Sequence, residues 1–537
     1  MKKRNCLVTA VLLALAMVMA AVSGGAAFAA DQHITFALHS IPDSIDPGIT
    51  SETYSSAILY NLFEGLLTYD AQNNLIPGQA EKWELSDDGL VYTFHLRDGL
   101  KWSDGTPITA EDFRYSWLRV ITPKTGSLYA DQLLPYVVGA QEFFDGKIGE
   151  DRVGIKAVDK KTLTVTLKSP TPFFLGLLST YTFFPVQKAT VEANNDKWTL
   201  SDKTYISNGP FKVTKINFNE SYEFVRNEHY WDAKNVKLDR LTFIYILDTS
   251  TALTAFRARE IDGFWEAPAS DLPVLRAESD ELVTVKAFGT TFHLMNNSAP
   301  PFDNPLVRKA FNLAIDRRAL IEDVLGTNDS PAYSLVAPGY VVGGVDVTEG
   351  RSSYGMAPGA LAKEAKAALA EAGYPDGKGF PDIVYYYSTN DTYKKTVEAL
   401  SAMLEKNLGI KITLKTADWA VFYADVQAGK YQIGQYGWGG DYLHPMTFLP
   451  LTVTNGVNNY SNYSNPEYDA LVVEIQRTTD QKRAAELIRK AEDTMMKDYP
   501  ILPLFHRSYS YMMRKGTAGY FRSPLNNLYF RDAYVTD

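Results

Sequence analysis

Asp441 is an isolated acid in an aromatic and glycine-rich stretch, residues 436–442, whose sequence is YGWGGDY. No other charged residue lies between Lys430 and Glu467. A carboxylate among aromatic side chains is partly desolvated, so it needs a cation or hydrogen-bond donors as partners. One interpretation is that Asp441 binds a cation that arrives with a ligand. The alternative is that Asp441 caps a helix or a turn while Trp438 packs in the core.

Other recognisable chemistry is missing from the sequence. It contains no G-x-G-x-x-G, Walker-type, H-E-x-x-H or G-x-S-x-G motif. Its seven histidines include no pair at i,i+3 or i,i+4 spacing, so no local metal pair is predicted. His444 lies close to Asp441 but beside a proline, and is interpreted as structural. We therefore predict no catalytic residue, no metal and no cofactor, although a secreted hydrolase that uses carboxylates from distant positions stays open.

The composition is that of a globular protein with many aromatic residues. The chain has 537 residues, too many for one core and enough for two or three lobes. Its 33 Tyr and 8 Trp combine apolar area with a polar group, which suits a binding cleft. Without Lys2, Lys3 and Arg4, the 53 basic residues fall to 50 against 63 acidic ones, a net charge of −13. This charge argues against nucleic acid or an anionic membrane as partner.

The first 30 residues have the pattern of a secretory signal peptide. Lys2, Lys3 and Arg4 precede an apolar run over residues 7–22, and small residues follow it. Because the run is short and ends in small residues rather than charges, an uncleaved membrane anchor is the less favoured alternative. The only cysteine, Cys6, precedes the run and so cannot be the lipid-modified residue of a lipoprotein signal. We expect a soluble protein exported to the periplasm.

The predicted elements change in kind along the chain. Between residues 83 and 246 most of them are strands, with a helix over residues 110–120 that begins with a capping box. From residue 305 onward helices and strands alternate, which indicates an α/β lobe. In that lobe a short strand over residues 431–435 is expected to lead into the glycine-rich turn that carries Asp441.

Four stretches spread along the chain share the pattern of a known family. They are residues 44–47 with 62–66, residues 80–105, residues 208–211 with 227–231, and residues 436–442. Together they resemble family 5 of the bacterial extracellular solute-binding proteins, the oligopeptide and dipeptide class that serves ABC importers. The second stretch is the most specific, whereas the third is weak by itself.

The resemblance implies an α/β, two-lobed, hinged periplasmic-binding-protein fold (type II, cluster C) with an additional inserted domain. After the signal peptide of residues 1–30, lobe I would combine three segments, and the lobes would close over a ligand. The implied division is lobe I of residues 31–74, 198–285 and 509–537, an inserted domain of residues 75–197, and an α/β lobe III of residues 286–508.

The resemblance also implies a substrate-binding site. Asp441 matches the carboxylate that pairs with the α-ammonium group of a peptide. Trp438, Gly437 and Gly439 match the adjoining strand, which binds the peptide backbone, and Tyr129 matches a tyrosine near the same terminus. Main-chain pairing of this kind holds a peptide whatever its side chains are.

The sequence departs from the family at the other end of the site. The basic groups that meet the peptide carboxylate in the best-known members fall here on Val426, Gln435 and Tyr393. We expect Tyr393 and Gln435 to face the ligand, without those charges. A ligand of a different length, or one without a free carboxylate there, is therefore plausible, and modified or cell-wall peptides remain open.

The resemblance implies a receptor rather than an enzyme. Its expected partners are a peptide ligand and the membrane permease subunits of an ABC transporter, with no nucleic acid, and the chain is expected to act as a monomer. The alternatives are the same fold with a non-peptide solute, such as a sugar or a nickel chelate, and the secreted hydrolase.

Overall fold

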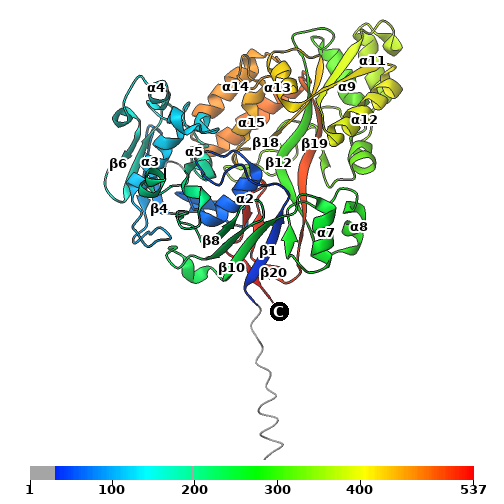
Figure 1. Ribbon diagram of the computed structural model, residues 1–537. Helices are drawn as coiled ribbons and strands as arrows, with labels where there is room; N and C mark the ends of the chain where they lie inside the picture. The colour runs from blue at the N-terminus through cyan, green and yellow to red at the C-terminus, as the bar shows by residue number, and fades with distance from the viewer. Residues whose placement is uncertain (1–30, 195–196, 537) are drawn as a thin grey trace, which may run out of the picture.

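The computed structural model describes residues 31–194 and 197–536, so the predicted signal peptide lies outside the described residues. One mixed sheet of eleven strands runs through the middle of the molecule (Figure 1). In sheet order its strands are β17 (Ile412–Ala417), β16 (Ile383–Ser388), β18 (Ile433–Gly439), β12 (Leu282–Met295), β19 (Ile501–Met513), β11 (Gly263–Phe264), β1 (His33–Leu38), β10 (Arg240–Tyr245), β9 (Ser221–Arg226) and β8 (Phe211–Asn217), and β13 (Ser330–Pro331) pairs with β19 off this path.

Two long antiparallel strands, β12 and β19, connect the two halves of this sheet. Figure 1 shows them side by side as they pass from the lower part of the molecule to the upper part. Their pairing is irregular, with register shifts between Lys286 and Thr290 and between Thr291 and Phe292. Such irregularities bend strands and increase their twist. The pair therefore has the position and the geometry of a hinge.

The lower lobe consists of β1, β8–β11 and the helices α7 (Thr249–Arg257) and α8 (Leu272–Glu278). β1 runs parallel to β10 and β11, whereas β8, β9 and β10 pair antiparallel. The hairpin of β8 and β9 turns through Asn219, whose φ of 64° lies in the left-handed region that asparagine tolerates. The strands predicted in this region are confirmed.

The upper lobe surrounds β16, β17 and β18, and is the predicted α/β region. β16 lies between β17 and β18 and runs parallel to both. Caps define the ends of its helices: the Asp418 carboxylate accepts a hydrogen bond from the Val421 N–H at 3.3 Å, and Gly409, with φ 73°, ends the helix of residues 391–408. The helices are α9 (Pro305–Ala314), α11 (Ala362–Glu371), α12 (Asp391–Leu408), α13 (Trp419–Gln427), α14 (Pro466–Arg477) and α15 (Gln481–Met496).

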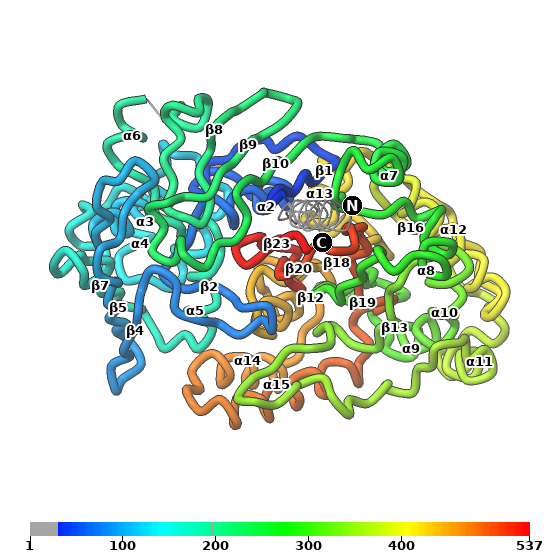
Figure 2. Tube along the Cα trace, turned by 90° about the horizontal axis from the view of Figure 1, so that it is seen from below, coloured from blue at the N-terminus to red at the C-terminus, as the bar shows by residue number. Residues whose placement is uncertain are grey.

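A side domain contains a separate sheet of four strands. Helix α3 (Ala110–Val120) opens with the predicted capping box, in which the Asp112 carboxylate accepts from the Thr109 N–H at 2.7 Å. Seen from below, this domain lies on one side of the molecule and α11 and α12 lie on the other (Figure 2). The sheet order is β4 (Ala80–Leu85), β5 (Val91–Leu96), β7 (Thr162–Thr166) and β6 (Ile155–Ala157).

A buried polar network fixes the side domain to the segment before α2 (Thr53–Leu62). Arg119 donates to both carboxylate oxygens of Asp46, at 2.9 and 2.8 Å, and Trp198 Nε1 donates to the same carboxylate at 3.0 Å. Because a buried charge pair needs good geometry to offset its desolvation, this two-pronged contact joins the two parts in one orientation.

Strand β18 is longer than predicted. It spans Ile433–Gly439 rather than residues 431–435, because its pairing with β12 continues as far as Gly289 opposite Gly439. The expected turn therefore begins only at Gly440. Since side chains alternate along a strand, Trp438 points to the opposite face from Gly437 and Gly439.

Among residues 31–194 and 197–536, no helix has the length and apolar character needed to cross a bilayer. The same residues include no cluster of three or more His, Cys, Asp or Glu side chains suited to a metal ion.

Candidate ligand-binding site

A cavity of about 240 Å³ lies where the lower lobe, the side domain and the upper lobe meet. Tyr129 of the side domain lines it together with Gly439 and Asp441 of the upper lobe, so three predicted site residues come together from distant parts of the sequence. Glu52, just before α2, and Arg507 of β19 also line it. Residues from all three parts of the molecule therefore bound the cavity.

Thr447 positions the Asp441 carboxylate. Its hydroxyl donates to Asp441 Oδ2 at 3.1 Å and accepts from the Asp441 backbone N–H at 3.1 Å and from Trp438 Nε1 at 3.2 Å. A hydroxyl can donate one hydrogen bond and accept two, so the Thr447 hydroxyl makes all the hydrogen bonds it can. Asp441 caps no helix; His444 does so instead, since its Nδ1 accepts from the Met446 N–H at 3.2 Å.

Burial, rather than a neighbouring positive charge, dominates the surroundings of the Asp441 carboxylate. Burial raises the pKa of Asp441 to about 6; the Thr447 hydrogen bond opposes this shift, and the like charge of Asp131 adds to it. In the part of the chain that the structure describes, no cationic side chain lies within ion-pair distance of this carboxylate. Burial and the nearby Asp441 raise the pKa of Tyr129 to about 12. A cationic group entering the cavity would therefore be stabilised.

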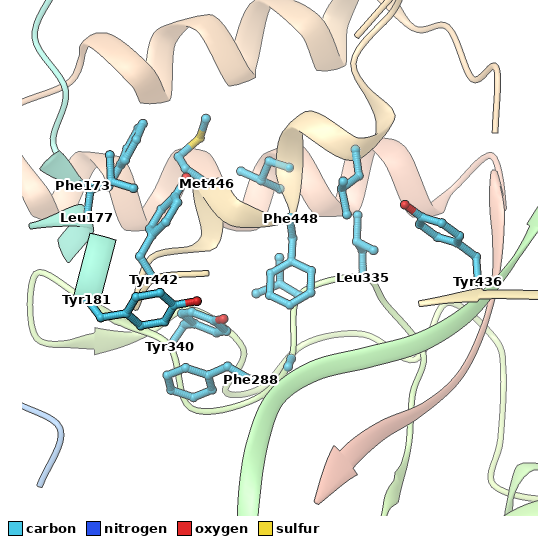
Figure 3. Packing of buried hydrophobic residues seen from close by; sticks show 14 of the residues in the cluster. Phe173, Leu177, Tyr181, Phe288, Leu335, Tyr340, Tyr436, Tyr442, Met446 and Phe448 are labelled. Carbon is cyan, nitrogen blue, oxygen red and sulfur yellow. The ribbon is translucent and has the colours of Figure 1, made fainter. Parts of the chain in front are cut away.

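Stacked aromatic rings hold the turn behind Asp441. Tyr442 stacks on Phe173 of the side domain, with ring centroids 5.1 Å apart and planes 12° apart, and Phe288 of β12 stacks on Tyr340 at 4.0 Å (Figure 3). The Gly440 N–H donates to the Phe288 carbonyl oxygen at 2.6 Å. The acid thus sits on a packed aromatic support between two domains, not on a free loop.

One edge of β18 is open beside the cavity. β12 pairs with β18 from Ile433 to Gly439, whereas β16 pairs with it only at Ile433 and Gly434. Because Gly440 bonds to β12 and antiparallel pairs alternate, the N–H and C=O groups of Gly437 and Gly439 point away from β12, toward the open edge. An edge of this kind is a template for an added strand.

The two strand glycines have different surroundings. A Cβ at Gly439 would meet nothing within 4 Å, so space is open above it. A Cβ at Gly437 would collide with the guanidinium group of Arg507, which therefore lies directly over this glycine. Trp438, on the opposite face, is partly buried and bonded to Thr447.

A second cavity, of about 580 Å³, shares Arg507 with the first. Tyr393, at the start of α12, lines it, as do Lys395 and His293. Gln435 lies elsewhere: it is buried, and its Oε1 accepts from the Ser388 hydroxyl at 3.3 Å. Val426 is also buried, on α13. Of the three positions without the family's basic groups, Tyr393 alone is among the residues that line this cavity.

Two residues of the site, Thr447 and Arg507, are not predicted from the sequence. Thr447 follows Asp441 by six positions within a mostly apolar segment, so a search for local hydroxyl partners of the acid could have found it. Arg507 gives no local signal, because β19 brings it to the site from a distant part of the chain.

Two lobes joined by crossing strands, with a site beside those strands, define the type II periplasmic-binding-protein fold, as predicted. Residues 74–460 match the family described as "Bacterial extracellular solute-binding proteins, family 5 Middle". The chain is 35% identical over 502 residues to the oligopeptide-binding protein OppA of Bacillus subtilis (strain 168), covering 92% of this chain and 91% of that protein. The chain therefore belongs to family 5 of the bacterial extracellular solute-binding proteins, which is not a known family of enzymes.

Solved structures of other proteins are similar to this fold over nearly the whole chain. The unliganded open form of the periplasmic murein tripeptide binding protein MppA is similar with a TM-score of 0.82 and 32% identity, covering 94% of this chain and 98% of that one. The complex of Haemophilus influenzae OppA with RPPGFSPFR is similar with a TM-score of 0.73 and 32% identity, covering 95% of this chain and 99% of that one.

Proposed function

We propose that the protein is an extracytoplasmic receptor that captures peptides in the cleft between its lobes and delivers them to the permease subunits of an ABC importer. The observation that carries this proposal is the partly buried Asp441 carboxylate, which has no cationic partner among the described residues and lies beside the open edge of β18. The relative named as an oligopeptide-binding protein and the complex with RPPGFSPFR support peptides as the class of ligand.

The proposed binding mode follows from this geometry. The α-ammonium group of the peptide replaces the missing charge at Asp441, as a charge-assisted hydrogen bond. The peptide backbone then adds to β18 through the groups at Gly437 and Gly439, which recognises any sequence. Tyr129 covers the terminus from the side domain, while side chains extend into the cavities, where water can adapt to them.

Capture also requires movement of the lobes. We propose the division expected from the sequence, because its limits at residues 285 and 508 fall within β12 and β19, where the chain passes between lobes. Bending at the irregular pairing of these strands would close the lobes over the peptide. We further propose that the chain acts as a monomer in the periplasm and has no catalytic activity.

Native mass spectrometry of the purified protein tests this function. We expect a retained peptide, or binding of one equivalent of an added tripeptide that stays intact over hours. Accumulating cleavage products would identify a hydrolase. Retention of a sugar or a metal chelate, with no binding of peptides, would identify a non-peptide receptor.

A further inference from the structure

We infer that Arg507 receives the α-carboxylate of the bound peptide, so that the cleft selects short peptides held at both termini. This inference rests on the proposed function and adds to it the class of peptide. It assigns the carboxylate to a residue on β19, a hinge strand, rather than to the three positions that lack the family's basic groups.

Two glycines let the Arg507 side chain reach the site. Its stem passes over Gly289 of β12, where a Cβ would lie 3.2 Å from Arg507 Cδ. Its guanidinium group then lies over Gly437 of β18, and Nε donates to Thr291 Oγ1 at 3.0 Å. A side chain at either glycine would obstruct this path. The two glycines and Thr291 therefore carry the cation across β12 to the strand whose edge is open.

The guanidinium group has donors to spare. Its five N–H groups include one used by Thr291, and within the described residues no carboxylate lies within ion-pair distance of it. Asp329 lines the same second cavity, but its carboxylate already accepts from Ser508 N–H at 2.7 Å and from Thr327 Oγ1 at 2.8 Å. A planar guanidinium group with free donors matches a carboxylate in a two-pronged contact.

A second polar group faces the same place. His293, which is fully buried and lines the second cavity, bonds through Nδ1 to the Tyr385 hydroxyl. Its Nε2 has no hydrogen-bond partner among the described residues. Buried polar atoms are rarely left unpaired, so Nε2 would gain a partner if a bound group reached it from this cavity. Arg507 thus supplies the charge, and the His293 tautomer with its proton on Nε2 would add a hydrogen-bond donor.

The spacing of the two charges sets the length of the ligand. Gly437, beneath the guanidinium group, precedes Asp441 by four residues. Four residues of strand span at most about 13 Å, and an extended peptide rises by about 3.3 Å per residue. A peptide with its ammonium group at Asp441 and its carboxylate at Arg507 therefore has two to four residues.

Calorimetry with trialanine and its C-terminal amide tests the inference. We expect amidation to weaken binding by the wild type about ten- to a hundredfold, the effect of losing a charge-assisted contact. Arg507→Gln should weaken binding of trialanine to the same degree and bind acid and amide equally. Thr291→Val removes only the acceptor that orients Arg507, and it should reduce the discrimination between acid and amide about threefold. Because this variant keeps the Arg507 side chain, it tests the same contact even if Arg507→Gln folds poorly.

Lys395→Gln is the matched control, since it removes another positive charge from the wall of the second cavity. It should keep the discrimination between acid and amide. Equal affinity of the wild type for acid and amide, or loss of discrimination in Lys395→Gln alone, would overturn the inference. So would a hexapeptide that binds more tightly than di-, tri- and tetrapeptides. If no peptide binds, the proposed function itself fails; if peptides bind but amidation has no effect, only the role of Arg507 fails.

Discussion

The two ends of the cleft hold opposite charges in different ways. At one end, Asp441 is fixed by Thr447, whose hydroxyl makes every hydrogen bond available to it, and by stacked rings from two domains. At the other end, the Arg507 side chain lies across two glycines and, among residues 31–194 and 197–536, forms one hydrogen bond, to Thr291. The acid is therefore pre-oriented and poorly solvated, whereas the base is adjustable.

This difference gives the two ends different roles. The Asp441 end selects a peptide with a free amino terminus, whereas the Arg507 end tolerates peptides of slightly different length. A desolvated acid whose charge is not neutralised disfavours the ligand-free state, so binding of an ammonium group that neutralises it is strongly favoured. A cation on a long side chain can follow carboxylates at slightly different positions, but ordering that side chain costs entropy. We therefore expect the Asp441 end to contribute more to affinity than the Arg507 end.

The largest effect is expected from Asp441→Asn, which keeps the shape of the side chain and removes its charge. Affinity for trialanine should fall about a hundredfold, more than for Arg507→Gln, because the ligand ammonium group would stay buried without a counter-charge. Asp131→Asn is the matched control; it removes the like charge near Asp441 and should change affinity by less than about threefold. An equal loss in the Asp441 and Asp131 variants would refute a special role for Asp441.

The second prediction concerns pH and distinguishes the two ends directly. The folded-state pKa of Asp441, about 6, is above its ordinary value of 3.8. This group therefore favours folding below about pH 4, and the contribution is lost as pH rises through 6. Ligand-free Asp441→Asn should accordingly be more stable than the wild type at pH 7.5, by on the order of 1–2 kcal/mol, and equally stable at pH 4.

Affinity should follow the same titration in the opposite sense. Below pH 6 the free protein is protonated at Asp441, so binding of trialanine should weaken about tenfold for each further pH unit. Arg507→Gln should keep this profile, since a guanidinium group stays charged throughout. Thermal unfolding and calorimetry between pH 4 and 8 measure both effects. A wild-type affinity that is flat between pH 4.5 and 7.5 would show that Asp441 does not bind the ammonium group.

A smaller effect is expected from Thr447→Val, which has nearly the same shape but no hydroxyl. The Asp441 N–H and Trp438 Nε1 would each lose their acceptor, at a cost of about 1–3 kcal/mol in stability. Affinity should fall about five- to tenfold, because the carboxylate would no longer be oriented. Thr447→Ser, which keeps the hydroxyl, should retain most of the stability and most of the affinity. If Thr447→Ser is as impaired as Thr447→Val, the cause is the packing of the methyl group and not the hydroxyl.

The smallest effect is expected from Tyr129→Phe. The ring stays in the wall of the cavity, and only a hydroxyl near Asp441 is removed. We expect affinity for trialanine to fall no more than about threefold in a titration at pH 7.5. A loss as large as that of Asp441→Asn would make Tyr129, not the acid, the main group at this terminus.

The sequence predicts the Asp441 end of the cleft but not the Arg507 end, and the reason is physical. The acid end is local: Trp438 and Asp441 lie in one short segment, so composition and spacing point to it. The base end forms only when β12, β18 and β19 pair, which brings Thr291, Gly437 and Arg507 together. No periodicity within one element encodes that contact.

The same reasoning applies to the fold. The capping box of Thr109 and Asp112 acts within one turn of a helix, and it is confirmed. The length of β18 is not predicted, because three glycines among residues 437–440 are typical of a turn until a partner strand is known. Pairing with β12 supplies the hydrogen bonds that extend the strand to Gly439.

The central claim is that Asp441 binds the α-ammonium group of a peptide. Calorimetry on wild type and Asp441→Asn, each with trialanine and N-acetyl-trialanine, tests it most directly. Each single change should weaken binding about a hundredfold, and the two together little more than either alone, because both remove the same interaction. Equal affinity of the wild type for the free and the acetylated peptide would contradict the claim, and Asp441 would then be a structural residue of a receptor for another kind of solute.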